Sequence, residues 1–168
     1  MFRYKINIIL LLILIWLSAC NEGLAPPPSG CKTYLNGLIT YKGGVSAWPA
    51  ESVYAIRVAA FKNYPFSDNS SIITEIENGN AYVNFTSLPL RVDTCGFSFE
   101  IKDTPVDLKY IAVALQYNDT DITAEKVVGI YTETGDRTKP SSIIINKCDS
   151  VFINIIVDFD SLPPQPFH

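Results

Sequence analysis

The chain has 168 residues with a formal net charge of −4, and 18% of its residues are charged. This length suits one domain. A mildly acidic chain without a basic cluster argues against nucleic acid as a partner, because phosphate binding requires clustered lysine and arginine. The only histidine, His168, is the last residue, so we do not expect catalysis that needs a histidine held by the fold.

Residues 1–19 have the three parts of a secretory signal peptide. Arg3 and Lys5 precede an apolar run over residues 6–19, which ends in the small residues Ser18 and Ala19. The run has about 14 residues, whereas a helix needs about 20 to cross the hydrocarbon core of a bilayer. We therefore predict that this segment is cleaved and is not a permanent membrane span.

The residues around the predicted cleavage site, Leu17-Ser18-Ala19-Cys20, resemble the lipobox of bacterial lipoproteins. The resemblance implies that the Cys20 thiol accepts a diacylglyceryl group and that Cys20 becomes the first mature residue. The alternative is a chance cysteine behind an ordinary signal. Each buried methylene contributes about 0.8 kcal/mol, so several acyl chains hold a protein firmly at a membrane. Asn21 in place of aspartate is similar to the enterobacterial pattern for the outer membrane and does not indicate a leaflet.

Residues 20–33 are predicted to be the lipidated cysteine and a proline-rich tether, since three consecutive prolines occupy residues 26–28. Proline-rich segments extend by about 3.1 Å per residue, which would hold the domain roughly 30 to 40 Å from the lipid. Loss of residues 1–19 also removes two basic residues, so the net charge changes from −4 to −6.

From residue 34 onward, short runs of β-branched and aromatic residues alternate with turn-forming residues, a pattern typical of an all-β domain. The last run is apolar at every second position, which indicates a strand that is central or nearly so. No segment has three turns of helical periodicity. The predicted strands cover residues 34–41, 53–61, 72–76, 81–86, 97–102, 110–117, 127–131, 142–145 and 151–159.

Residues 34–160 are therefore predicted to form an all-β, two-layer antiparallel β-sandwich of about seven to nine strands, transthyretin-like or immunoglobulin-like. A proline-rich tail follows over residues 161–168, and strand spacing alone does not exclude a closed barrel. The runs at 35–41, 53–61, 110–115 and 151–159 resemble strands of the transthyretin-like, carboxypeptidase regulatory-like sandwiches found in many lipoproteins. The chain lacks the Asp-Gly-Tyr or Asp-Gly-Phe turn that is common in that family.

Three cysteines follow Cys20, namely Cys31, Cys95 and Cys148. Export to an oxidising compartment favours a disulfide, and the odd number leaves one thiol over, with three pairings open. We favour Cys31 with Cys148, because they lie a few residues before the first and last predicted strands, which are commonly parallel neighbours in a sandwich. Spacings this wide do not indicate a zinc site.

Aromatic residues on two loops are the best candidates for ligand contact. Trp48 precedes the second predicted strand, and Tyr64 and Phe66 follow it. Exposed rings at one end of the sandwich would form a patch that stacks on sugars or anchors a protein. The alternative is that these rings fold back over the end of the sandwich.

Carboxylates offer a second candidate chemistry. Asp119, Asp121 and Glu125 lie close together in the sequence, as do Asp158 and Asp160. Paired carboxylates can act as acid and base, although solvated loop residues have the same pattern. Oxygen ligands at residues 118–121 lack the glycine and distal glutamate of a calcium loop of about twelve residues. We expect no metal and no cofactor.

These features favour a non-enzymatic binding or accessory module, held at the envelope membrane by its lipid, with an envelope protein or glycan as partner. The first alternative is a carbohydrate-binding surface lipoprotein that uses the aromatic residues. The second is a carboxylate-based hydrolase. A sandwich fold alone does not choose among them, because sandwiches carry many functions.

Overall fold

A computed structural model describes residues 30–50, 53–117 and 125–167. The predicted signal peptide, Cys20, the loop with Asp119 and Asp121, and His168 lie outside the described residues. The chain divides into two compact units, Met1–Cys31 and Lys32–His168, and all the described strands belong to the second. No helix within the described ranges has the length and hydropathy needed to span a bilayer.

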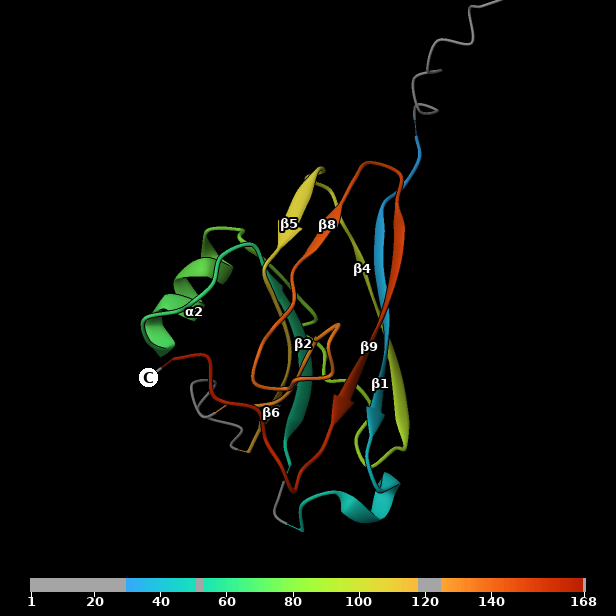
Figure 1. Cartoon of the computed structure of the whole chain (residues 1–168), viewed down its shortest axis with the longest axis vertical. Helices are drawn as coiled ribbons and strands as arrows, with labels where there is room; N and C mark the ends of the chain where they lie inside the picture. The colour runs from blue at the N-terminus through green and yellow to red at the C-terminus, as the bar shows by residue number, and fades with distance from the viewer. Residues whose placement is uncertain (1–29, 51–52, 118–124, 168) are drawn as a thin grey trace, which may run out of the picture. The chain divides into compact units, whose positions relative to one another are not determined.

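The described strands form three separate sheets of an all-β sandwich, as predicted, instead of one closed sheet (Figure 1). Their orders are β4-β1-β9, β3-β2-β6-β7 and β5-β8. The bounds are β1 Tyr34–Tyr41, β2 Ala55–Phe61, β3 Ala81–Val83, β4 Thr94–Glu100, β5 Val106–Leu108, β6 Tyr110–Gln116, β7 Glu125–Ile130, β8 Ile143–Ile145 and β9 Ser150–Val157.

Strand β1 is the central strand of the three-stranded sheet, antiparallel to β4 and parallel to β9. The first and last predicted strands are therefore parallel neighbours, as expected. The last strand, predicted to be central or nearly so, is next to the central strand β1 but is itself the edge strand of its three-stranded sheet. Its inward residues are buried, whereas Phe152 and Ile156 on its outer face are 64% and 55% exposed. The apolar residues at every second position form the inward face, and such alternation indicates one buried face without fixing the place of the strand in its sheet.

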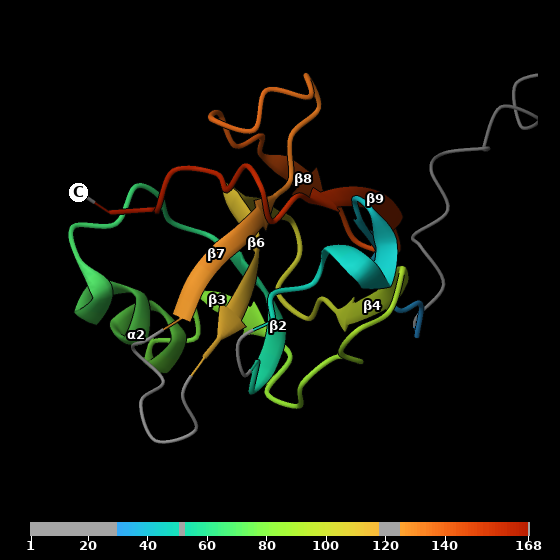
Figure 2. The ribbon, with the colours of Figure 1, turned by 90° about the horizontal axis from the view of Figure 1, so that it is seen from below.

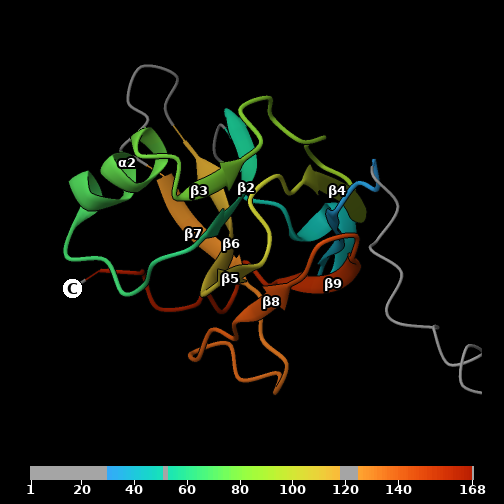
Figure 3. The ribbon, with the colours of Figure 1, turned by 90° about the horizontal axis from the view of Figure 1, so that it is seen from above.

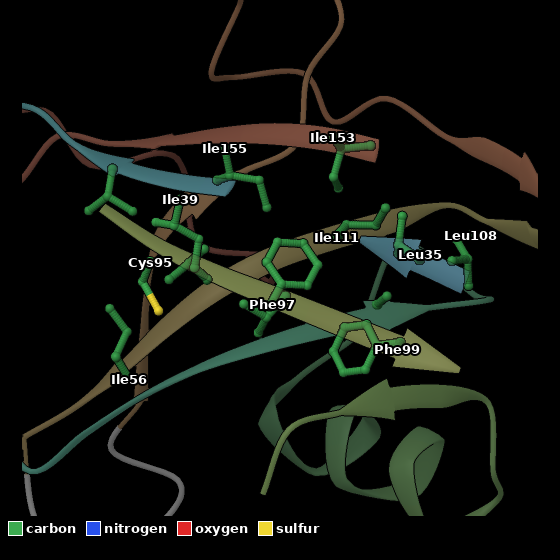
Figure 4. Packing of buried hydrophobic residues seen from close by; sticks show 14 of the residues in the cluster. Leu35, Ile39, Ile56, Cys95, Phe97, Phe99, Leu108, Ile111, Ile153 and Ile155 are labelled. Atoms are coloured by element: carbon green, nitrogen blue, oxygen red, sulfur yellow. The ribbon is translucent and has the colours of Figure 1, made fainter. Parts of the chain in front are cut away.

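Alternation along the strands builds one core between the sheets. Ile56 and Ile111 point inward from the four-stranded sheet, and Leu35 and Ile39 point inward from β1 (Figure 4). The Cys95 side chain joins this core from β4 and is a buried free thiol. Residues at the intervening positions of β2 and β6 therefore face the opposite side of their sheet. That outer face carries the candidate site.

The predicted strand over residues 72–76 is wrong, because this segment belongs to helix α2 (Asn69–Glu77). Asp68 caps the helix: one of its carboxylate oxygens accepts a hydrogen bond from the Ser71 N–H at 2.8 Å. The Ser71 hydroxyl in turn accepts from the Asp68 N–H at 3.3 Å. This reciprocal capping box satisfies N–H groups that a helix start leaves unpaired, and the left-handed Gly79 follows the end of the helix. The β-branched residues within the helix resemble a strand when only residue type is considered.

The two cysteines of the favoured disulfide are both oxidised, since Cys31 and Cys148 are each disulfide-bonded. Their pairing with each other stays a prediction. Two hydrogen bonds draw the entry of β1 to the turn before β9: Cys148 N–H donates to the Thr33 hydroxyl at 2.8 Å, and Tyr34 N–H donates to the Asp149 carbonyl at 2.9 Å.

Candidate functional site

An apolar cavity of about 240 Å³ lies on the outer face of the β3-β2-β6-β7 sheet. Helix α2 covers this face, on the side of the sheet opposite to β1 and β9 (Figure 2). The C-terminal segment runs past β7 toward the same side (Figure 3). The cavity is therefore enclosed by a sheet, a helix and a segment of irregular chain.

Small side chains make the floor of this pocket. Ala59 on β2 pairs in register with Ala112 on β6, and Ala114 lies two residues further along β6. Each side chain ends at Cβ, so the space below α2 is not filled from the sheet. Ile72, Ile73 and Ile76 of α2 line the opposite side. The result is an apolar slot between the surface of the sheet and helix α2.

Aromatic rings close one end of the pocket. The rings of Phe61 and Phe66 meet edge to face with centroids 4.9 Å apart, and Tyr64 stacks on Tyr110 at 4.6 Å. Phe61, Phe66 and Tyr110 are at most 7% exposed. The Tyr110 hydroxyl is buried with no hydrogen-bond partner in the described part of the chain, and this burial raises its pKa well above the ordinary tyrosine range.

An ion pair marks the other end. Arg57 Nη1 donates to Glu125 Oε1 and to Gln116 Oε1, each at 2.6 Å, and its Nε donates to the Phe85 carbonyl at 3.3 Å. The Arg57 and Glu125 side chains are 20% and 28% exposed. Burial raises the pKa of the Glu125 carboxyl, and Arg57 partly opposes that shift. Phe85 at the rim is 75% exposed, so among the described residues this end is the more exposed one.

The C-terminal segment, predicted to be a proline-rich tail, packs against β7 and forms the remaining wall of the pocket. The Gln165 side-chain amide hydrogen-bonds both backbone polar groups of Val127. Its Oε1 accepts from the Val127 N–H at 2.9 Å, and its Nε2 donates to the Val127 carbonyl at 3.1 Å. Because β7 is an edge strand, this amide satisfies backbone groups that would otherwise lack a neighbouring strand. Pro166 and Phe167 then line the pocket.

The aromatic patch expected from Trp48, Tyr64 and Phe66 does not form, because their loops leave opposite ends of β2. Trp48 is 5% exposed. Its ring centroid lies 4.6 Å from that of Tyr41, and its Nε1 donates to the Val92 carbonyl at 3.0 Å. Of the three predicted rings, Phe66 lines the pocket, half-buried Tyr64 supports its closed end, and Trp48 closes the other end of the sandwich.

The candidate carboxylates that the structure describes do not form one cluster. Asp158 is buried and lies 2.8 Å from Lys42 Nζ and 3.4 Å from Arg137 Nη1. Its hydrogen bond to Lys42 lowers the pKa of Asp158, which is the opposite of what a general acid needs near neutral pH. Glu125 lies in β7, apart from Asp158. Within the described ranges, no three His, Cys, Asp or Glu side chains come together as metal ligands.

No protein-family model matches the chain, and searches of curated proteins and of solved structures give no significant match.

The pocket was not predicted from the sequence. Its floor depends on three alanines in two strands that pair only in the folded sheet, and its roof depends on a helix that resembles a strand in sequence. The usable signals were the spacing of Ile72 and Ile76, one helical turn apart, and the Asp68 to Ser71 capping pattern.

Proposed function

We propose that this chain is a lipid-anchored, non-enzymatic binding module of the cell envelope, held at the outer membrane through Cys20, and that its pocket holds an apolar ligand. The pocket is the observation that carries the binding function: it is concave, mostly apolar and edged by a few polar groups, as small-molecule sites usually are. The lipobox resemblance supports the anchor. The burial of Trp48 and Phe66 argues against the carbohydrate alternative, which relied on exposed rings at Trp48, Tyr64 and Phe66; of these, Tyr64 is half-buried.

Lipidation is tested by labelling the full precursor in a Gram-negative host with an alkyne analogue of palmitate. The wild-type chain should carry the label and lose residues 1–19, whereas Cys20→Ser should remain unlabelled, because the thiol is the acceptor. Cys95→Ser is the matched control and should keep the label. Label on Cys20→Ser would contradict the proposed anchor.

Binding is tested on residues 21–168, which contain the whole described domain, in buffer without detergent. The uncharged fluorescent probe N-phenyl-1-naphthylamine should bind the wild-type domain with a blue-shifted, enhanced emission. Ala112→Leu should reduce probe affinity by about tenfold or more, because the added side chain fills the slot and removes apolar contact.

Thr40→Leu is the control, since it adds the same side chain on the exposed outer face of β1. Circular dichroism should show both variants folded. If Ala112→Leu binds the probe as tightly as Thr40→Leu does, the pocket is not the binding site.

A further inference from the structure

We infer that the pocket takes an uncharged, straight-chain amphiphile, with its alkyl tail at the aromatic end and its polar head beside Arg57 and Glu125. This inference rests on the proposed binding function and names the ligand class for the same pocket. Three features support it: the difference between the two ends of the pocket, the length and width of the slot, and the balanced charges of Arg57 and Glu125.

The direction comes from the difference between the two ends. The closed end consists of Phe61, Phe66 and Tyr110, all at most 7% exposed. The polar end has partly exposed Arg57 and Glu125 side chains. A ligand that enters tail first buries its apolar part fully and leaves its head where hydrogen-bonding groups and water are present. The reverse orientation would bury the polar head among these three rings, where the Tyr110 hydroxyl is the one polar side-chain group, so its desolvation would be less well compensated than at the Arg57 and Glu125 end.

The length and width come from the floor. Arg57 and Phe61, at the two ends of the slot, are four residues apart on β2, and a strand advances about 13 Å over that distance. This backbone span is an upper limit for the slot, so the slot holds a straight chain of at most about ten carbons. The isoleucines of α2 lie over an alanine floor, which leaves a narrow space. Such a slot accommodates an unbranched chain, or a flat aromatic probe such as N-phenyl-1-naphthylamine, lying along its length.

The charge of the head follows from the ion pair. Arg57 Nη1 already donates to both Glu125 and Gln116 at 2.6 Å, so the two charges balance within contact distance. An anionic head would lie beside the Glu125 carboxylate, and a cationic head beside the Arg57 guanidinium. Each repulsion is strengthened by partial burial. A hydroxyl or amide head avoids both and can still hydrogen-bond to the remaining Glu125 oxygen.

The test is displacement of N-phenyl-1-naphthylamine from residues 21–168 by three ten-carbon compounds that differ only in the head: decanol, decanoate and decylammonium. Decanol should displace the probe at a roughly tenfold lower concentration than either ion. Octanol, which is two methylenes shorter, should be about fifteenfold weaker than decanol, because each buried methylene is worth about a fourfold change in affinity. Dodecanol should gain little, because the aromatic rings close the far end.

Glu125→Gln gives an independent test of the head. Removing the carboxylate leaves the Arg57 charge without its ion-pair partner, so decanoate should improve by about tenfold relative to decanol. Equal displacement by all three heads, tighter binding of either ion to the wild-type domain, or no displacement by any of them would overturn the inferred ligand class. In each case the proposed function stands if the probe itself binds. If the probe does not bind, the proposed function fails as well.

Discussion

Replacing Gly37 by alanine is expected to lower the free energy of unfolding by about 1 to 3 kcal/mol, the usual cost of overpacking a core. Gly37 lies in the middle of β1, between Phe97 of β4 and Ile153 of β9. An added Cβ would meet the Phe97 ring and lie 3.0 Å from the Ile153 carbonyl oxygen. The ring is buried in the core (Figure 4), so its displacement disturbs neighbouring contacts. Urea unfolding followed by circular dichroism measures the loss.

Gly96 provides the matched control, because it is a glycine of the adjacent strand with an open outer side. An added Cβ there has the Gly37 carbonyl oxygen at 3.8 Å as its nearest neighbour, which is ordinary contact. Gly96→Ala should therefore be neutral or stabilising by up to about 1 kcal/mol, since glycine weakens a strand. Equal losses for the two glycines would contradict the packing of Phe97 on Gly37.

A double variant separates the ring contact from backbone effects. Phe97→Leu removes the atoms that collide with the new methyl group, so Gly37→Ala should cost less in that background than in the wild type. Neighbouring core residues commonly show such coupling, of about 0.5 to 3 kcal/mol. Strict additivity would indicate that the glycine is required by the backbone and not by the ring.

The alternation of apolar and polar residues along the longer strands made the sandwich predictable from the sequence. Strand β1 has the predicted bounds, and β2, β6 and β9 differ from prediction by a few residues at their ends. These strands are seven or eight residues long, so their periodicity is well defined. Strand β5 was not predicted. It has three residues, VDL, and so short a run carries almost no periodic signal.

Residue type misled the prediction where local hydrogen bonding decides the structure. Ile72, Ile73 and Thr74 favour strands as individual residues, but the Asp68 and Ser71 cap starts a helix whose apolar face covers the sheet. Tertiary packing overrides intrinsic propensity here. For the aromatic loops, the alternative in which the rings pack back onto the sandwich holds for Trp48 and Phe66. The two residues flank the same strand, β2, and therefore lie at its opposite ends, so they cannot share one patch.

Removing the disulfide is expected to have the largest effect on stability, a loss of about 3 to 5 kcal/mol if Cys31 and Cys148 pair with each other. The closed loop would contain 118 residues, from Cys31 to Cys148, and a cross-link over about 100 residues restricts the unfolded chain by roughly 4.7 kcal/mol in the chain-entropy account. In residues 21–168, Cys31→Ser, Cys148→Ser and the double variant should all lose the same amount, because each removes the same bond.

Thiol counting with a chromogenic disulfide reagent tests the pairing directly. The folded wild-type domain should not react, since Cys95 is buried and burial raises the pKa of its thiol, which lowers the reactive thiolate fraction. Unfolding in urea should expose one thiol in the wild type, two in each single variant and one in the double variant. A double variant that is less stable than either single variant by a further few kcal/mol would show that the two cysteines act separately, and the predicted pairing would then be wrong.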